Sequence, residues 1–138
     1  MAIFENDLLK LIFHGTPIPG LADNAATGAL TTLYLALHTA APVSGGPQAM
    51  NEANYTGYAR IAVARSAEGW TVVGNDSALV ADQFFPAASN MTNLPQTGTH
   101  VSIGTAATGA GKILFTGPLP ELVAFLNTTV RAGLAAGI

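Results

Sequence analysis

The hydrophobic positions of the chain follow a helical period near the N-terminus. The apolar positions of residues 3–13 that recur at this period are Phe4, Leu8, Leu11 and Ile12. Gly15 and Pro17 follow this run and are typical of a helix end. The pattern therefore predicts one short N-terminal helix, which could cover the end of a core or pack against a partner.

From residue 31 onward the pattern changes to the alternation of a β-strand. In residues 31–39, Leu33, Leu35 and Leu37 would share one face, which predicts a strand buried on one side. Gly, Pro, Asn and Ser separate further short runs of strand character. These runs are residues 55–66, 69–73, 79–85, 99–105, 113–116 and 122–126.

Seven or eight short strands with one short N-terminal helix predict an all-β fold of the jelly-roll or β-sandwich type. A length of 138 residues is typical of one domain. We therefore expect a single β-sandwich domain over residues 1–138, with residues 1–15 as an N-terminal helical arm. The two longest predicted loops, residues 40–54 and 86–98, are candidate contact arms.

The chain is unusually poor in charged residues. Asp, Glu, Lys and Arg make up 9% of it, against roughly 25% in an ordinary soluble domain. None of them occurs in residues 24–51 or 83–111. Because interface cores are depleted in charge, one interpretation is that partners cover much of the surface. The other is a sequence that is simply rich in Ala, Gly and Thr.

Several classes of protein are disfavoured by the composition. The five basic residues are scattered and form no patch for nucleic acid. Prolines and glycines interrupt both charge-free stretches, so neither is long and apolar enough for a membrane span. Glu5 and Asp7 stand where a signal peptide would carry Lys or Arg. Cysteine is absent, which excludes disulfides and thiolate metal sites.

The segment GTAATGAGKILF, residues 104–115, superficially looks like a phosphate-binding loop. A Walker A motif requires Gly five positions before its Gly-Lys pair and Ser or Thr directly after it. Here these positions are Ala106 and Ile113, and a strand rather than a helix follows. The segment therefore predicts the turn of a hairpin and no nucleotide site.

No other constellation selects a catalytic or metal site. His14, His38 and His100 lie too far apart for a local ligand pair. The carboxylates are scattered, although two of them could still meet across a cleft, and no serine lies in a G-x-S-x-G elbow. Tyrosines and Trp70 could line a sugar-binding face, but strands commonly bury such residues in a core. We expect no enzyme activity, no metal and no cofactor.

Five segments in order resemble a family of small virion proteins of tailed bacteriophages. They lie between residues 33 and 119 and include LHT, N-E-x-x-x-x-x-Y-A-R, Phe-Pro and H-x-x-I-G-T-A. The matching positions are His38, Thr39, Asn51, Glu52, Tyr58, Ala59, Arg60, Phe85, Pro86, His100, Ile103, Gly104, Thr105, Ala106, Gly117 and Leu119. Members of this family are often labelled tail-fibre-like, and some resemble jelly-roll head-decoration proteins.

The resemblance implies a structural part of a virion. We expect a capsid cement, or decoration, protein on the outer surface of the phage head, because a fibre normally shows a shaft, a coiled coil or repeats. Its partner would be the major capsid protein of the assembled shell, which it would stabilise by binding the assembled state. The alternative is a tail-fibre or tail-tip component that binds a host receptor.

Two sets of contact residues follow from this interpretation. A homodimer across a two-fold axis is expected, with a trimer as the rival, through the helix residues Phe4, Leu8, Leu11 and Ile12. The shell would be contacted by the loop of residues 49–55, including Met50, Glu52 and Tyr55. The family pattern commonly carries a further strand after an Asn-Gly turn, but Thr128 follows Asn127 here. Whether the C-terminal tail forms a final strand is left undecided.

Overall fold

The computed structural model of the chain describes residues 2–18, 30–43, 45–124, 130–132 and 135–137. Contacts between residues divide the chain into two compact units. Unit 1 comprises Met1–Leu33, Val63–Asp82 and Gly133–Ile138, and unit 2 comprises Tyr34–Ala62 and Gln83–Ala132. Each unit is described by itself below, and the single domain expected over residues 1–138 stays a prediction.

Unit 1 begins with the predicted helix. Helix α1, Ala2–Leu9, continues into a π-helical turn, η1, Lys10–His14. Gly15 takes a φ of 71°, a left-handed conformation that glycine adopts without steric cost, and ends the helix. The predicted N-terminal helix and its end at Gly15 are confirmed.

An arginine from a distant part of unit 1 caps the end of this helix. The last carbonyls of a helix have no partner within it. The guanidinium of Arg65 donates from Nε to the carbonyl of Ile12 at 2.6 Å and from Nη2 to the carbonyl of Leu11. Its Nη1 donates to the carbonyl of Leu30 at 2.9 Å. A positive charge at a helix C-terminus also complements the helix dipole.

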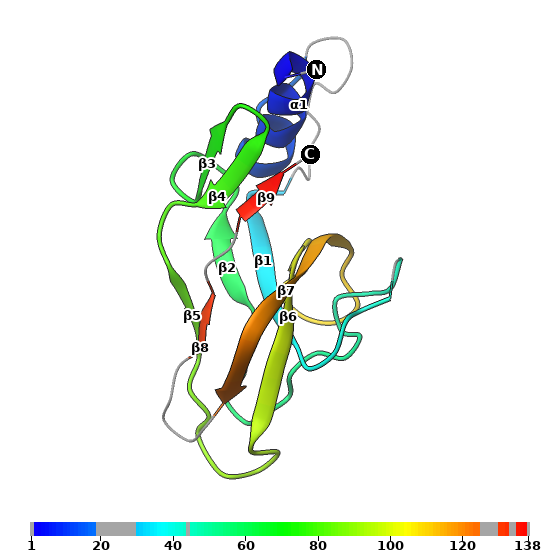
Figure 1. Cartoon of the computed structure of the whole chain (residues 1–138), viewed down its shortest axis with the longest axis vertical. Coiled ribbons are helices and arrows are strands. Elements are labelled where there is room, and N and C mark those ends of the chain that lie inside the picture. The colour runs from blue at the N-terminus through cyan, green and yellow to red at the C-terminus, as the bar shows by residue number, and fades with distance from the viewer. Residues whose placement is uncertain (1, 19–29, 44, 125–129, 133–134, 138) are drawn as a thin grey trace. The chain divides into compact units, whose positions relative to one another are not determined.

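The sheet of unit 1 has three antiparallel strands in the order β3-β4-β9 (Figure 1). They are β3, Trp70–Val73, β4, Asp76–Leu79, and β9, Ala135–Gly137. The predicted run at residues 69–73 matches β3. The predicted strand at residues 79–85 is wrong in its bounds. β4 already ends at Leu79, and the next strand begins only at Gln83.

The core of unit 1 forms where the helix meets this sheet. Leu9, Phe13 and Trp70 are fully buried, and the rings of Phe13 and Trp70 lie 4.5 Å apart between centroids. His14 donates from Nε2 to the carbonyl of Trp70 at 2.9 Å. The buried helix positions therefore differ from the predicted apolar stripe, since Phe4 is 43% exposed.

The main sheet, most of which belongs to unit 2, has the order β2-β1-β6-β7. Its strands are β2, Ile61–Ala64, β1, Thr32–His38, β6, Gln96–Gly104, and β7, Ile113–Ala124. β1 and β6 are antiparallel and pair His38 with His100. The strands predicted around residues 31–39, 55–66 and 99–105 all have counterparts in this sheet.

β7 joins two stretches that the sequence predicted as separate runs. It continues through Pro118 and Pro120, which lack the N–H group that a central strand must donate. The strand tolerates them because it lies at the edge of the sheet and pairs only with β6 among the described strands.

Two strands form in the C-terminal tail, for which the sequence did not decide whether a final strand is present. β8, Val130–Ala132, pairs with β5, Gln83–Phe85, and β9 pairs with β4. The described residues thus contain nine strands instead of seven or eight. The predicted fold class, all-β with one short N-terminal helix, is confirmed, and its antiparallel sheets are consistent with a sandwich.

β1 is buried more completely than its alternating pattern predicts. Leu33, Leu35 and Leu37 are buried as expected, but Ala36 and His38 on the opposite face are buried as well. The expectation of a strand buried on one side is therefore wrong over its second half. The reason is the long loop that follows β1, because its Met50 carbonyl contacts His38 and its Ala53 N–H donates to the carbonyl of Leu37.

Candidate functional site

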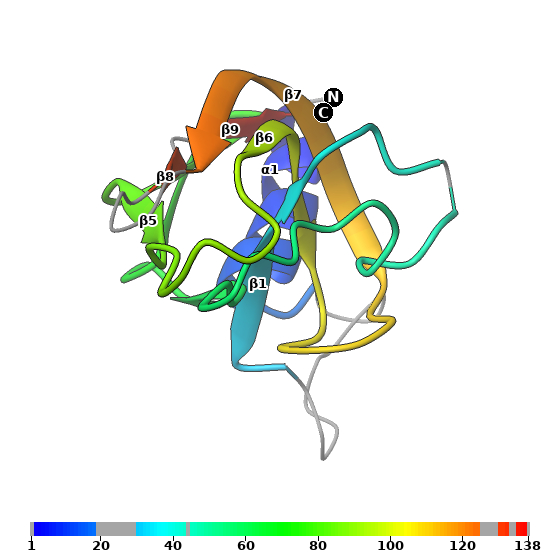
Figure 2. The ribbon, with the colours of Figure 1, turned by 90° about the horizontal axis from the view of Figure 1, so that it is seen from below.

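Polar side chains attach the loop between β1 and β2 to the rest of unit 2. This loop runs beside the turn that connects β6 and β7, and Pro47 forms an isolated antiparallel bridge with Lys112 of that turn (Figure 2). Gln48 in this loop is fully buried. Because buried polar groups require hydrogen-bond partners, the contacts of this loop define how it is held.

An ion pair forms the centre of these contacts. Arg60 donates from Nε to Oε2 of Glu52 at 2.7 Å and from Nη2 to Oε1 at 2.9 Å. The side chain of Arg60 is 2% exposed and that of Glu52 is 15% exposed. Hydrogen bonding to Glu52 raises the pKa of Arg60, so the guanidinium stays charged. Two parallel bonds from a guanidinium to a carboxylate also fix the relative orientation of the two side chains.

Tyr58 connects this ion pair to β1. Its hydroxyl donates to Oε2 of Glu52 at 2.8 Å and accepts from the backbone N–H of Leu37 at 3.0 Å. Burial raises the pKa of Tyr58, and the neighbouring carboxylate of Glu52 acts in the same direction. The phenol therefore remains a neutral donor, as the carboxylate requires.

Arg60 also reaches across to the turn between β6 and β7. It donates to the carbonyl of Ala106 at 2.8 Å and to the carbonyl of Gly109 at 2.6 Å. The amide oxygen of Gln48 accepts from the N–H of Ala106 at 3.0 Å. We call Gln48, Glu52, Tyr58 and Arg60 the loop network, since together they join the loop, β1 and the turn.

Two glycines leave room for the amide of Gln48. A Cβ atom at Gly104 would lie 2.0 Å from Cδ of Gln48, and one at Gly111 would lie 2.2 Å from its Oε1. Both distances are far below a van der Waals contact. The glycines that made this segment look like a phosphate loop therefore serve the close approach of a buried amide.

His38 and Ser102 form a second polar contact in unit 2. Nδ1 of His38 donates to the carbonyl of Met50 at 2.8 Å, which leaves Nε2 to accept from the hydroxyl of Ser102 at 2.8 Å. Both side chains are fully buried. A serine beside a histidine is a possible nucleophile, but both side chains here are closed off from solvent, and their contacts tie β1, β6 and the loop together.

The stability of the fold is expected to depend on pH through His38. Burial lowers the pKa of His38 below its usual value of about 6.5, with Arg60 and His100 acting in the same direction and Glu52 and the Met50 carbonyl opposing. Between the folded and unfolded pKa values, His38 is protonated in the unfolded chain and neutral in the folded chain. The contribution of His38 to the free energy of unfolding is therefore complete above about pH 6.5. Below that pH it falls by at most about 1.4 kcal/mol per pH unit.

Urea unfolding between about pH 7.5 and pH 5.5 measures this slope before the carboxylates titrate. His38→Gln should flatten it, because glutamine does not titrate in this range. An unchanged slope in His38→Gln would assign the pH dependence to other groups.

Two hollows lie on the two sides of the turn between β6 and β7. One, of about 340 Å³, is lined by Glu52, Ala53, Asn54, Tyr55, Tyr58, Ala59, Arg60, Ala107, Thr108 and Gly109. The other, of about 550 Å³, is lined by Gly45, Gly46, Pro47, Ala110, Gly111, Lys112 and Ile113. Glu52, Tyr58 and Arg60 of the loop network are part of the wall of the first hollow.

The predicted shell-contact residues have internal partners. Tyr55 is 2% exposed and donates to the carbonyl of Pro86 at 2.7 Å, and Glu52 belongs to the loop network. Met50 is partly exposed, and its Sδ accepts from the N–H of Val43 at 3.4 Å. The structure shows how these residues hold the loop, while their contact with a shell stays a prediction.

The predicted oligomer-contact residues all lie on the N-terminal helix of unit 1. Phe4 is exposed, and Leu8, Leu11 and Ile12 are half-buried. Their role as contacts between copies stays a prediction.

The sequence interpretation missed the loop network as a unit. From the sequence, Tyr58 and Arg60 belong only to a family-like pattern, Glu52 is assigned to a shell contact as well, and Gln48 has no role. Their spacing follows neither a helical nor a strand period, so no periodicity could have joined them. The available signal was a pair of opposite charges in a segment otherwise poor in charge.

Neither a metal centre nor a spanning helix is found in the part of the chain that the structure describes. No three side chains of His, Asp or Glu gather there around a common point. Each described helix is too short or too polar to cross a membrane.

Comparison with known families decides the affiliation of the chain. The sequence profile of the family described as "Podophage GP4 fiber I protein gp80" matches residues 2–131. The chain belongs to this family. A search of curated proteins found no match.

Membership in the gp80 fibre family covers both units and nearly the whole sequence. It supports the resemblance to phage virion proteins, and it does not single out capsid cement. The chain is therefore a phage structural protein, for which a fibre role is supported at least as well as the head role expected from the sequence.

Proposed function

We propose that the chain is a structural component of a phage fibre and contributes a contact surface without catalysing a reaction. The observation that carries this proposal is the match of residues 2–131 to a family described as a podophage fibre protein. In the sequence analysis a fibre role was the alternative to capsid cement. The proposal adopts this alternative because the family description names a fibre.

The geometry of unit 2 supports a contact role. The loop network and the pair of His38 with Ser102 fix a long loop and a hairpin turn through hydrogen bonds of 2.6 to 3.0 Å. A loop that is ordered before binding loses little conformational freedom when it meets a partner. Such loops on a sheet are a common framework for recognition.

The polar groups that could suggest an enzyme are engaged inside unit 2. Ser102 and His38 are fully buried, and both carboxylate oxygens of Glu52 accept hydrogen bonds from Arg60. A catalytic base must reach the proton that it abstracts in a bound substrate. The arrangement therefore favours a structural role for these residues.

Immunogold labelling of intact virions tests the fibre proposal against capsid cement. An antibody raised against the full chain should label fibres, and the isolated head should lack the protein after fibres and tails are removed. Labelling spread over the head surface, with loss of head thermal stability when the protein is stripped, would instead support the cement role. Protein absent from both would refute a place in the mature virion.

The N-terminal helix provides a test of self-association. Phe4 is exposed and lies on the same helix as the buried Leu9. If the exposed side of the helix forms the contact between copies, Phe4→Glu should convert the oligomer to a monomer while leaving the unfolding midpoint almost unchanged. Light scattering after size-exclusion chromatography measures the mass.

Lys10→Glu, which places a negative charge on the same helix without removing an apolar side chain, serves as the matched control. An oligomer that survives Phe4→Glu would remove this part of the helix from the interface.

A further inference from the structure

The larger of the two hollows in unit 2 has walls that carry a single formal charge. Its lining consists of glycine, alanine, proline and isoleucine together with Lys112. The two segments that wall it come from the charge-free stretches of residues 24–51 and 83–111, apart from Lys112 and its neighbour Ile113. Its volume of about 550 Å³ lies within the range of about 300–1,000 Å³ that is typical of small-molecule sites.

Lys112 is held at a fixed place in this wall. Its N–H donates to Oγ1 of Thr105 at 3.0 Å and its carbonyl accepts from the N–H of Thr105 at 3.1 Å. On the opposite wall, the N–H of Gln48 donates to the carbonyl of Gly111 at 2.9 Å. Both walls are therefore joined to each other and to the loop network beneath them.

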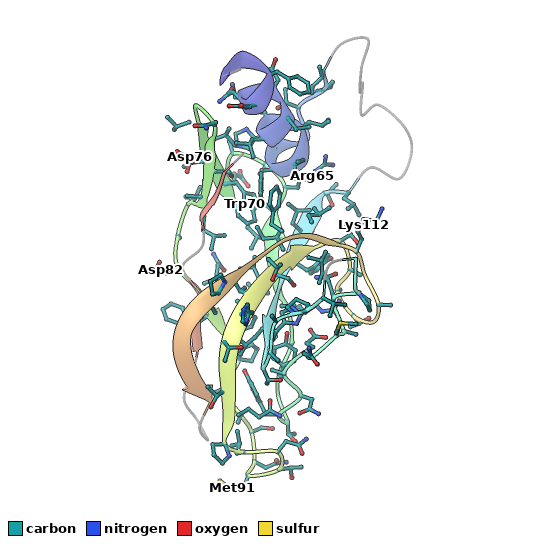
Figure 3. The ribbon with its side chains drawn as sticks, turned by 45° about the vertical axis from the view of Figure 1, so that its right-hand side comes forward. Arg65, Trp70, Asp76, Asp82, Met91 and Lys112 are labelled. Carbon is teal, nitrogen blue, oxygen red and sulfur yellow. The ribbon has the colours of Figure 1, made fainter. Side chains whose placement is uncertain are left out.

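The ammonium group of Lys112 is available to a ligand. The side chain is exposed and points away from the ribbon (Figure 3). In the part of the chain that the structure describes, no carboxylate pairs with it. A cation without a nearby carboxylate attracts an anion from solution, and neutral walls do not oppose that attraction.

We propose that this hollow binds one anionic group, a carboxylate or a phosphate, carried on a neutral polar molecule of the size of a saccharide. The single lysine matches one anionic group, whereas a nucleotide with several phosphates would require more cations or a helix N-terminus. Gly45 and Ala110 are exposed in this lining, and their peptide groups offer polar surface to the neutral part of the ligand. The interpretation of the hollow as a contact site for the host rests on the proposed fibre role. Binding of the ligand to the free chain does not depend on that role.

A second explanation of Lys112 makes a different prediction. Lysines beside an exposed strand edge keep that edge from pairing with another chain, and Lys112 directly precedes the edge strand β7. Lys112→Glu separates the two roles, because a negative charge still protects the edge but repels an anion. Lys112→Arg preserves both roles.

Nuclear magnetic resonance titration of the full ¹⁵N-labelled chain tests the proposal. The probes are galacturonate, its neutral analogue galactose, inorganic phosphate and acetate. Galacturonate should shift the amide signals of Gly45, Gly46, Gly111 and Lys112 with a dissociation constant of about 1–10 mM, as befits one charge-assisted contact at an exposed site. Lys112→Arg should bind within about threefold of the wild type, and Lys112→Glu should weaken binding at least about tenfold.

Each outcome decides the proposal. Saturable shifts with galacturonate or with phosphate, lost in Lys112→Glu, support an anion site, and the stronger probe identifies the source of the anion. Equal shifts with galactose, shifts that persist in Lys112→Glu, or no shifts with any probe would overturn it. Self-association of Lys112→Gln, with no probe binding to the wild type, would assign the lysine to edge protection. None of these results alters the immunogold test of fibre location.

Discussion

Arg60→Ala is expected to destabilise the chain by about 3–5 kcal/mol, the usual cost of removing one partner of a buried ion pair. The change leaves the carboxylate of Glu52 in a largely buried position without its two guanidinium donors. The carbonyls of Ala106 and Gly109 lose their donor at the same time. Urea unfolding followed by circular dichroism measures the loss.

Two further variants separate the ion pair from simple loss of charge. Lys112→Ala removes an exposed cation close to the same turn and should change stability by no more than about 0.5 kcal/mol. The double variant Arg60→Met with Glu52→Leu should lose less than the sum of the two single changes, because no unpaired charge remains buried. A loss below about 1 kcal/mol for Arg60→Ala would show that water or another cation replaces the guanidinium.

Phe13→Ala is expected to destabilise unit 1 by about 3–5 kcal/mol, as for other large-to-small changes of a buried aromatic residue. Phe13 is fully buried, and its ring centroid lies 4.5 Å from that of Trp70. Trp70 is the single tryptophan of the chain, so its fluorescence reports on this contact directly. Loss of the neighbouring ring should move the emission to longer wavelength and lower the unfolding midpoint.

The matched control for this prediction lies on the same helix. Phe4→Ala removes an identical ring from a position that is 43% exposed, and it should cost far less and leave the Trp70 emission unchanged. Similar losses for the two variants would mean that the helix is held by its exposed side instead of by Phe13.

Strands with strong alternation could be predicted from the sequence, whereas those formed by pairing could not. β1 carries leucines at every second position and appeared where expected. β4 begins with Asp76 and Ser77, which rarely favour strands, and forms because a two-residue turn at Gly74 and Asn75 folds it onto β3. The Gly-Asn pair was the local signal of this hairpin.

The polar contacts of unit 2 were beyond local reasoning for a different reason. Arg60 and the carbonyl of Ala106 are 46 positions apart, and Gln48 and the N–H of Ala106 are 58 apart. Such contacts depend on which loops the sheet brings together, which no short window contains. The sequence therefore predicted the hairpin turn within residues 104–115 but could not show that its glycines accommodate a glutamine.

The prolines of β7 have a consequence for the infected cell, where virion proteins accumulate before particles are built. Concentrated chains with an open strand edge can stack into continuous ribbons, because unpaired N–H and C=O groups of the edge form hydrogen bonds with the backbone of another chain. Pro118 and Pro120 withhold two donors along the outer strand of the main sheet. We therefore expect the stockpiled protein to resist ribbon growth along this strand and to remain competent for assembly.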